Sequence, residues 1–280
     1  MHPGMVTIAG AGPGDPELIT VKAVNCLRMA DVVLTDRLVS ADILHRYVPA
    51  SAELIEVGKQ CRRGISTPQE TIDALLVRYA LQGKRVVRLK GGDVAFFSNI
   101  LNELQALVQH HIPYEIIPGI TAASGASAYA GIPLTARGYA TAVRFLTYYQ
   151  AALISDTDWK DLAHTSDTLV FYMSSETCGE LAGKLVEYGI SKDKQMAVIE
   201  QATTPYQRVH ITPVHAHAGN LAGTAFLSPS LIIVGNVVNL HASFGWKENA
   251  QENTYYFQPL TGVLESIPAD SKNTNYADRA

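Results

Sequence analysis

Short apolar runs alternate with longer amphipathic stretches along the first half of the chain, which predicts strands alternating with helices. Apolar runs of this kind are typical of buried strands, and apolar residues at every third or fourth position are typical of helices. We expect strands at residues 5–10, 31–34, 54–57, 85–90 and 114–117, and helices over residues 16–29, 40–47, 67–81, 99–110 and 122–130. This alternation predicts a mostly parallel sheet covered on both faces.

The pattern restarts after a linker over residues 131–141. We expect strands at residues 142–147, 168–173, 196–200, 207–212 and 231–238, and helices near residues 176–188 and 215–221. Two of these strands follow each other with no room for a helix between them, so the second sheet should be mixed. The prediction is an α/β fold class with two α/β domains, residues 1–133 and 134–246.

The chain changes character after Trp246. Residues 247–280 are polar and show no sustained apolar period. We expect a mobile tail, and removal of the residues after Asn249 should leave the fold intact.

Composition narrows the class of protein. The chain has 280 residues, and 47% of them are hydrophobic, which is enough for a real core. A net charge of −4 argues against a general nucleic-acid partner, no apolar run is long enough for a membrane span, and the N-terminus lacks signal-peptide features. Cys26, Cys61 and Cys178 form no CxxC pair, so neither a disulfide framework nor a metal site is indicated. We expect a soluble, reduced, cytoplasmic protein without a membrane partner.

The turn Gly10–Asp15 follows the first strand and leads into a helix. Asp15 stands where a helix N-cap belongs, and Pro16 stands at the first helical position. Glycines in such a turn let a ligand approach the backbone, because no Cβ stands in the way. It is not a dinucleotide fingerprint, since Asp15 occupies the place of the third glycine. The alternative is an ordinary strand-to-helix turn without a ligand.

Several turns of this kind fall at one edge of the predicted sheet. Ligands of open α/β sheets bind beyond the carboxyl ends of the strands. These ends carry Gly10–Asp15, Asp36–Arg37, Gly58–Lys59, Gly91–Asp93 and Pro118–Thr121. We find no GxSxG elbow, Walker loop or HExxH motif. The convergence of the five turns predicts the ligand site.

The motifs at these turns, taken together and in order, resemble the uroporphyrinogen-III C-methyltransferases of the tetrapyrrole methylase superfamily. The resemblance covers about residues 5–246. It rests on GAGPGD (residues 10–15), DRLVS (36–40), VGK (57–59), RVVRLKGGD (85–93), PGITAAS (118–124), AGIPLT (130–135), FYM (171–173) and SPSLIIVG (228–235). It implies a homodimer of two-domain chains, with S-adenosyl-L-methionine in the cleft between the domains.

The resemblance also implies roles for individual residues. The reaction would be C-methylation of uroporphyrinogen III to precorrin-2, in the sirohaem or cobalamin branch of tetrapyrrole biosynthesis, with S-adenosyl-L-homocysteine as the second product. Asp36 matches the proton acceptor and Lys59 the proton donor. The cofactor-binding positions are Pro13, Gly91, Gly92, Asp93, Phe96, Thr121, Ala122, Met173 and Ala202. Cations should face the substrate carboxylates, and the candidates are Arg37, Lys59, Arg62, Arg63 and Arg137.

The chain departs from the family pattern on the expected substrate side. Where the family reads GGDPF-x-FGRGGEE, residues 91–103 read GGDVAFFSNILNE, so that Asn99 replaces an Arg and Asn102 replaces a Glu. Other departures are Ala136 for a His, Tyr148–Tyr149 for Gly-His, and Ala202 for a Gly. Two alternatives therefore stay open: a methyltransferase of the same fold acting on another tetrapyrrole or other substrate, and a module that binds cofactor or tetrapyrrole without turnover.

Overall fold

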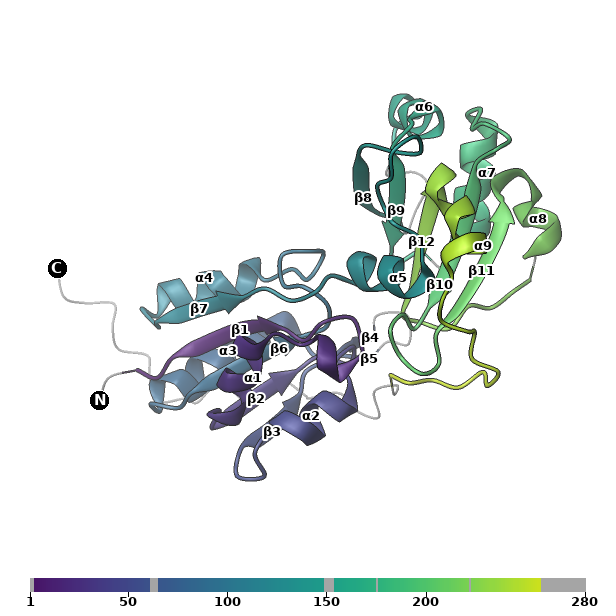
Figure 1. Ribbon diagram of the computed structural model, residues 1–280. Coiled ribbons are helices and arrows are strands. Elements are labelled where there is room, and N and C mark those ends of the chain that lie inside the picture. The colour runs from purple at the N-terminus through teal and green to yellow at the C-terminus, as the bar shows by residue number, and fades with distance from the viewer. Residues whose placement is uncertain (1–2, 61–64, 149–153, 175, 222, 258–280) are drawn as a thin grey trace.

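The computed structural model describes residues 3–60, 65–148, 154–174, 176–221 and 223–257, which form two lobes (Figure 1). Each lobe is built around its own five-stranded sheet. This arrangement confirms the predicted α/β class with a parallel and a mixed sheet.

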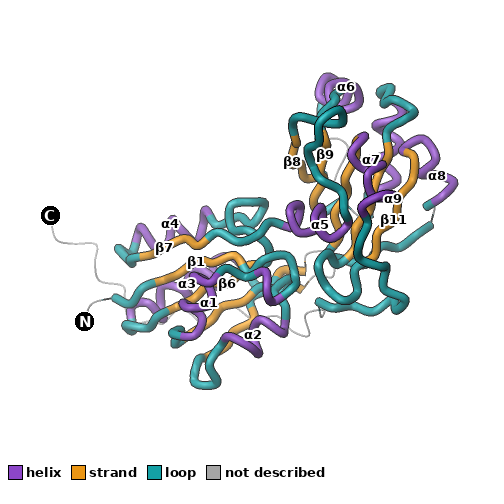
Figure 2. The backbone as a smooth tube through the Cα atoms, in the orientation of Figure 1, coloured by secondary structure: helices purple, strands orange, loops and turns teal. Residues whose placement is uncertain are grey.

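The first sheet is parallel throughout, with the strand order β3-β2-β6-β1-β7. Its strands are β1 (Val6–Gly10), β2 (Val32–Thr35), β3 (Glu53–Glu56), β6 (Val86–Lys90) and β7 (Tyr114–Ile117). Helices α1 (Val21–Arg28) and α2 (Ala41–Tyr47) cover one face, and α3 (Gln69–Leu81) and α4 (Leu101–Gln109) cover the other. Figure 2 shows the helices of this lobe on either side of the strands. All parallel strands end at the same edge, which faces the second lobe.

The predicted helix over residues 16–29 is divided in two. A 3-10 turn spans Pro16–Leu18, and Asp15 caps it by accepting a hydrogen bond from the Glu17 amide at 2.9 Å. Thr20 has extended backbone angles and caps α1 in its turn, accepting from the Ala23 amide at 3.2 Å. Two successive N-caps interrupt the apolar period, which explains why the single long helix is replaced by two elements.

The second sheet is mixed, with the strand order β11-β10-β12-β9-β8. Its strands are β8 (Val143–Thr147), β9 (Thr168–Tyr172), β10 (Gln195–Glu200), β11 (Arg208–Pro213) and β12 (Ser230–Gly235). Only β8 and β9 pair in parallel, and the other pairs are antiparallel. The predicted strand over residues 231–238 ends at Gly235, where a 3-10 turn, Asn236–Leu240, begins.

Helices on both faces complete this lobe. They are α5 (Ala122–Ala130), α6 (Asp156–His164), α7 (Cys178–Glu187), α8 (His217–Asn220) and α9 (His241–Phe244). The buried alanines of α5 pack with Ile199 and Ile233, so α5 belongs by packing to the second sheet, although the predicted domain boundary places it in the first domain. Helix α6 was not predicted, although Ser155 accepts from the Asp158 amide as its N-cap and Trp159 is buried.

A short hairpin lies between β3 and α3. Its strands are β4 (Lys59–Gln60) and β5 (Ile65–Ser66), which pair in antiparallel register. The sequence pattern predicts neither a strand nor a helix between residue 57 and residue 67, so this hairpin was not predicted. The hairpin follows directly from the strand end that was predicted to carry a catalytic lysine, and Figure 1 places it at the junction of the lobes.

The end of the described chain does not behave as a free tail. Residues 249–257, the terminal strap, follow the second lobe along β11 and then cross toward α2 (Figure 1). The Asn249 side chain accepts from the Val209 amide at 2.7 Å and donates to the Val209 carbonyl at 3.1 Å. The strap therefore starts like an added strand at the edge of the sheet.

The terminal strap also joins the two lobes. Gln201 donates to the carbonyl of Thr254 at 2.8 Å and accepts from the amide of Tyr256 at 2.7 Å. The Tyr256 hydroxyl lies 2.7 Å from the Ser40 hydroxyl and donates to Asp42 at 3.0 Å. These contacts correct the expectation of a mobile tail for the part that ends at Phe257, because polar side chains and three aromatic rings replace the missing apolar period. The remaining predicted tail, residues 258–280, lies outside the described residues.

Candidate functional site

Three turns at the carboxyl edge of the first sheet pack against one another through their backbones. Gly12 and Gly92 exchange two hydrogen bonds, at 3.1 and 2.8 Å. A Cβ at Gly10 would lie 2.6 Å from the Gly92 carbonyl oxygen, and a Cβ at Gly119 only 2.3 Å from it. The sequence therefore needs glycine at both positions for the turns to approach this closely. The predicted convergence of the turns is present in the structure.

Asp93 holds two of these turns together. Its Oδ1 accepts from the Ala95 amide at 2.8 Å, and its Oδ2 accepts from the Gly119 amide at 2.7 Å. The residue is buried. Both carboxylate oxygens thus accept hydrogen bonds from backbone amides of the site. Asp93 therefore fixes the turn that follows β6.

Loops of the second lobe close over these turns. The Thr121 hydroxyl lies 2.7 Å from the Tyr172 hydroxyl, which also accepts from the Ala123 amide at 3.1 Å. The Asp15 amide donates to the Thr203 hydroxyl at 3.0 Å. The ends of β9 and β10 in the second sheet therefore meet the glycine turns of the first.

The predicted cofactor-binding residues gather at this junction of the lobes. Pro13 is buried, and a Cβ at Gly125 on α5 would lie 2.6 Å from its ring, while a Cβ at Gly14 would lie 3.2 Å from the Ala202 carbonyl oxygen. The partly or largely exposed members of the set are Gly91, Gly92, Phe96, Thr121, Ala122, Met173 and Ala202. Most of the predicted cofactor-binding residues are thus accessible to a ligand, whereas Pro13 and Asp93 are buried beneath them.

The exposed rings at the junction form an aromatic group. Phe96 meets Phe145 edge to face, with 5.4 Å between ring centroids, and Phe97 lies 4.8 Å from the ring of Tyr172. Phe96 and Phe97 remain 39% and 43% exposed although each contacts another ring. They offer an apolar surface to a ligand that enters between the lobes.

Left-handed backbone conformations are concentrated around the junction. The non-glycine residues with positive φ there are Phe97 (54°), Asn99 (48°), Met173 (57°), Gln201 (45°) and Thr203 (69°). In the described chain one other non-glycine residue, His111 at the end of α4, has positive φ. Such conformations cost of order 1–3 kcal/mol each and cluster at functional sites. The distribution supports a ligand site at this place.

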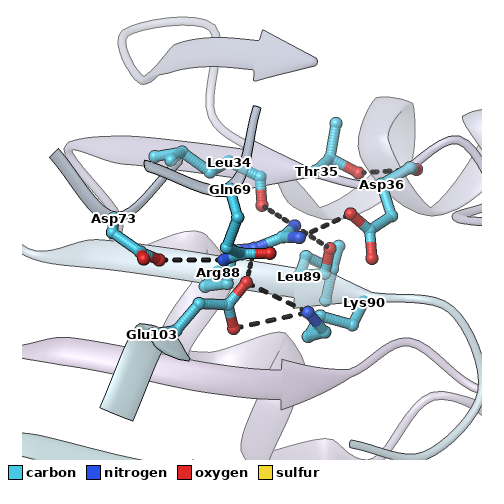
Figure 3. Close-up of polar contacts among 9 residues, drawn as sticks. All are labelled: Leu34, Thr35, Asp36, Gln69, Asp73, Arg88, Leu89, Lys90 and Glu103. Atoms are coloured by element: carbon cyan, nitrogen blue, oxygen red, sulfur yellow. Dashed lines mark hydrogen bonds and ion pairs between the residues drawn. The ribbon is translucent and has the colours of Figure 1, made fainter. Parts of the chain in front are cut away.

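A network of buried charges lies beneath the same edge (Figure 3). The Arg88 guanidinium contacts the Asp36 carboxylate at 2.5 Å and the Glu103 carboxylate at 3.0 Å. Lys90 Nζ lies 3.0 and 3.3 Å from the two oxygens of Glu103. Arg88, Lys90 and Glu103 are buried, whereas the Asp36 side chain is 27% exposed. Asp36 is therefore the member of the network that can reach a ligand.

Burial lowers the pKa of both cations of the network, whereas pairing with carboxylates raises it, and the balance differs between Arg88 and Lys90. For Arg88, burial opposes the charge, but the carboxylates of Asp36 and Glu103 outweigh it and raise the pKa. For Lys90, burial and then the neighbouring charge of Arg88 lower the pKa, against the pull of Asp36 and Glu103. The guanidinium is thus the permanent cation of the network.

Sequence reasoning selected Asp36 but missed Arg88, Lys90 and Glu103. Arg88 and Lys90 alternate with apolar residues in a strand that was expected to be covered on both faces. Charges at such positions must be buried, and buried charges need partners. That signal could have led to Glu103, which stands in the first turn of α4 and faces them.

The second predicted catalytic residue, Lys59, starts the hairpin. The Val57 amide donates to the Thr35 carbonyl at 2.9 Å, so the segment before Lys59 lies beside the one that carries Asp36. The Lys59 side chain, Arg62 and Arg63 lie outside the described part of the chain. Of the other predicted cations, Arg37 is partly buried directly after Asp36 and Arg137 is exposed.

The departures from the family pattern fall in different surroundings. Asn99 and Asn102 are exposed at the start of α4. Tyr148 is 1% exposed and packs edge to face on Trp159, so it belongs to the core of the second lobe; Tyr149 lies outside the described residues. Ala136 is partly exposed.

The described residues contain no group of three His, Cys, Asp or Glu side chains placed to hold a metal ion. Among the described helices, none combines the length and the apolar character needed to cross a bilayer.

Comparison with known proteins places the chain in a family. Residues 5–217 match the model of the Tetrapyrrole (Corrin/Porphyrin) Methylases. A siroheme synthase of Neisseria meningitidis serogroup C is 47% identical over 252 residues, which cover 90% of this chain and 51% of that protein. The chain thus spans about half the length of the curated relatives it matches.

Solved structures agree with this match. Uroporphyrin-III-C-methyltransferase from Thermus thermophilus is 35% identical, with a TM-score of 0.72 over 88% of this chain and 98% of that one. A second structure of the Thermus thermophilus enzyme, complexed with S-adenyl homocysteine, is 33% identical, with a TM-score of 0.68 over 85% of this chain and 94% of that one. Because the family model matches residues 5–217 of 280, this chain belongs to the tetrapyrrole methylase family.

Proposed function

We propose that the chain transfers methyl groups from S-adenosyl-L-methionine to carbon atoms of uroporphyrinogen III, giving precorrin-2. The observation that carries the proposal is the convergence of the turns at Gly12, Gly92 and Gly119 beneath Thr121 and Tyr172. The uroporphyrin-III-C-methyltransferase from Thermus thermophilus, which supports this proposal, is matched over 98% of its length.

The residues at the junction fit a cofactor of this kind. A Cβ at Gly92 would lie 3.8 Å from the Ala122 amide nitrogen, with no other atom of the described chain within 4 Å, so the backbone is open on that side. Gly91, Gly92, Phe96, Thr121, Ala122, Met173 and Ala202 would contact S-adenosyl-L-methionine, with Pro13 and Asp93 as their framework. When bound, the cofactor supplies an electrophilic methyl group on a sulfonium. S-adenosyl-L-homocysteine would remain at the same residues after transfer.

The protein contributes positioning and proton transfer. Methyl transfer leaves the ring system with a positive charge, which is neutralised when a C–H group next to the methylated pyrrole ring loses a proton, and a carboxylate at the ligand edge can take that proton. Asp36 is the partly exposed carboxylate at that edge, and we assign it the role of proton acceptor. Lys59 is assigned the role of proton donor, because the segment before it runs beside Thr35.

A second candidate is methyl transfer to another tetrapyrrole. Asn99 replaces an Arg and Asn102 a Glu of the family pattern on the exposed start of α4, so the expected substrate side has one cation fewer to pair with substrate carboxylates. We further propose a homodimer that works in the cytoplasm, and sedimentation of the purified chain tests the oligomeric state.

The deciding experiment is incubation with uroporphyrinogen III and S-adenosyl-L-methionine, followed by absorbance and by the mass of the methylated products. We expect two methyl groups to be added to the ring. Asp36→Asn keeps the shape of the side chain and should lower kcat by about a hundredfold or more. Its affinity for S-adenosyl-L-homocysteine, measured by calorimetry, should stay at the parent value.

The result separates the candidates. Methylation of other reduced tetrapyrroles but not of uroporphyrinogen III would favour the second candidate. Cofactor binding without turnover of any of them would leave a binding module and contradict the proposed activity.

A further inference from the structure

Arg88 occupies a position where a strand buries its side chain. It sits in β6 between Ile8 of β1 and Leu34 of β2, both of which are fully buried on the same face. The guanidinium itself is 2% exposed. A charge in such surroundings is costly unless it is paired and fully hydrogen-bonded.

Stability alone does not account for this cation. Buried ion pairs can often be replaced by apolar side chains of similar volume without loss of stability. Val86, two residues earlier in the same strand, occupies the same face of the sheet and is apolar. An apolar residue at position 88 would therefore suit the core, which suggests that Arg88 is needed for a contact that only a guanidinium can make.

The contacts of Arg88 fix the plane of its guanidinium. Nε donates to Glu103 at 3.0 Å, and Nη1 donates to the carbonyl oxygens of Leu34 at 3.4 Å and Leu89 at 3.3 Å. Lys90 holds Glu103 from the other side. With Nε and Nη1 engaged, Nη2 is directed at Asp36 Oδ1, 2.5 Å away (Figure 3).

The second oxygen of Asp36 is left for another partner. Oδ2 has no hydrogen bond to any side chain or backbone group in the described part of the chain, and the residue lies where β2 ends at the ligand edge. One oxygen is thus anchored and the other is available. This is the arrangement that a proton acceptor requires.

We propose that Arg88, held in place by Glu103 and Lys90, is a positioning residue that orients Asp36 Oδ2 toward the carbon that loses its proton. The inference rests on the proposed function, in which Asp36 takes that proton. In the step concerned, methyl transfer has left the pyrrole ring with a positive charge, and the methylated carbon itself carries no hydrogen. A C–H bond of the neighbouring methylene bridge breaks, its electron pair forms a double bond to the ring and neutralises the charge, and the proton goes to Oδ2. A lysine at position 88 could offer a charge but not the fixed fork that spans Glu103 and Asp36.

A double-mutant cycle on turnover tests the coupling. Arg88→Lys should lower kcat by about ten- to a hundredfold, because a displaced catalytic group costs up to that factor. Asp36→Asn should cost about a hundredfold or more. The double variant should be no slower than Asp36→Asn alone, because Arg88 acts through Asp36. The affinity for S-adenosyl-L-homocysteine should be unchanged in all three, which separates positioning from cofactor binding.

A matched control comes from the far end of the same two strands. Arg85 precedes β6 and contacts Asp31, which precedes β2, at 3.4 Å. Arg85→Lys makes the same chemical change in an exposed ion pair away from the ligand edge. It should leave kcat at the parent value.

A further variant guards against misfolding of Arg88→Lys. Replacing the three buried members together, Arg88→Met, Lys90→Met and Glu103→Leu, removes every buried charge of the network and leaves Asp36 without its anchor. This variant should fold, bind S-adenosyl-L-homocysteine and show a kcat lowered at least as far as in Arg88→Lys.

Three results would overturn the inference, and they can be told apart. If Arg88→Lys lowers kcat by the same factor with and without Asp36→Asn, Arg88 acts independently and only the positioning role is lost. If the triple variant is folded and turns over at the parent rate, the same role is lost. If Asp36→Asn keeps the parent rate, or the parent shows no turnover, the proposed role of Asp36 fails and the inference fails with it.

Discussion

The two lobes contribute different material to their junction. The first lobe presents backbone: its turns are packed so closely that Gly10 and Gly119 leave no room for a Cβ. The second lobe presents side chains, with Tyr172 at the end of β9, Met173 directly after it and Ala202 after β10. Close-packed glycine turns distinguish the first surface, whereas left-handed non-glycine residues occur on both, at Phe97 and Asn99 in the first lobe and at Met173, Gln201 and Thr203 in the second.

The buried charges of the two lobes also differ in what they contact. In the first lobe, Arg88 and Glu103 are connected to Asp36, which remains partly exposed. In the second lobe the buried carboxylate of Glu200 contacts His210 at 2.8 Å and accepts from the Leu227 amide, so it fastens a strand and a loop. From this comparison we propose that proton chemistry belongs to the first lobe, and that the cofactor lies between the backbone surface of the first lobe and the side chains of the second. The predictions below test that division.

The largest expected effect is on the backbone surface of the first lobe. Gly92 has a φ of 68°, and its missing side chain leaves the turn open toward Ala122. Gly92→Leu should fill that space and weaken binding of S-adenosyl-L-homocysteine by about a hundredfold or more, as blocking contacts at a buried site typically cost several kcal/mol. Calorimetry measures the loss directly.

Gly138→Leu is the matched control for this variant. Gly138 also has positive φ, at 81°, but a Cβ there would have no described atom within 4 Å. It therefore carries the same backbone strain without touching the junction. Equal affinities in the two leucine variants would show that strain, rather than occupation of the site, is responsible, and the assignment of the first lobe as the cofactor surface would have to be withdrawn.

The sheets and glycine turns could be predicted from the sequence more fully than the side-chain contacts between distant segments. Apolar periodicity and glycine turns located both sheets, because each of those signals is local along the chain. The Arg88–Glu103–Asp36 network joins β6, α4 and the end of β2, and no local pattern states which distant charge faces which. The terminal strap was missed for a related reason: Asn249, Thr254 and Tyr256 are held mainly by hydrogen bonds rather than by an apolar stripe.

The next effect concerns the terminal strap, which spans the boundary between the lobes. Phe257 is 3% exposed at its end. Phe257→Ala should lower the free energy of unfolding by about 2 kcal/mol, the order expected for removing a buried aromatic side chain at a chain end. For a domain of this size that corresponds to a fall in Tm of roughly 4–8 °C, which calorimetric melting can resolve.

Phe244→Ala is the control, because Phe244 is 60% exposed in α9. Its Tm should stay close to that of the parent. If both variants melt at the parent temperature, the strap does not stabilise the two lobes, and the junction is held by the loops alone.

The smallest effect is expected at a single hydrogen bond between α5 and the first glycine turn. The Tyr129 hydroxyl donates to Asp15 Oδ2 at 2.7 Å, and burial, followed by the neighbouring carboxylate of Asp15, raises the pKa of Tyr129 to about 12. An unfolded tyrosine ionises near pH 10, so above that pH the unfolded chain releases this proton more readily than the folded one. The stabilisation by Tyr129 is therefore complete below pH 10 and is lost as the pH rises toward 12.

Tyr129→Phe should accordingly lower the free energy of unfolding by about 1 kcal/mol near neutral pH, the usual value of one hydrogen bond. Between pH 10 and 12 the variant should lose stability less steeply than the parent, although not without slope, because the pKa of Tyr148 is also raised to about 12 and Tyr148 remains. As a control, Tyr139→Phe removes an exposed hydroxyl from the loop after α5. It should change neither the free energy of unfolding near neutral pH nor its slope above pH 10. Urea unfolding at a series of pH values measures both. If Tyr129→Phe keeps the parent slope above pH 10, the hydroxyl does not hold the glycine turn to α5, and the loops of the second lobe would have to fix that turn without it.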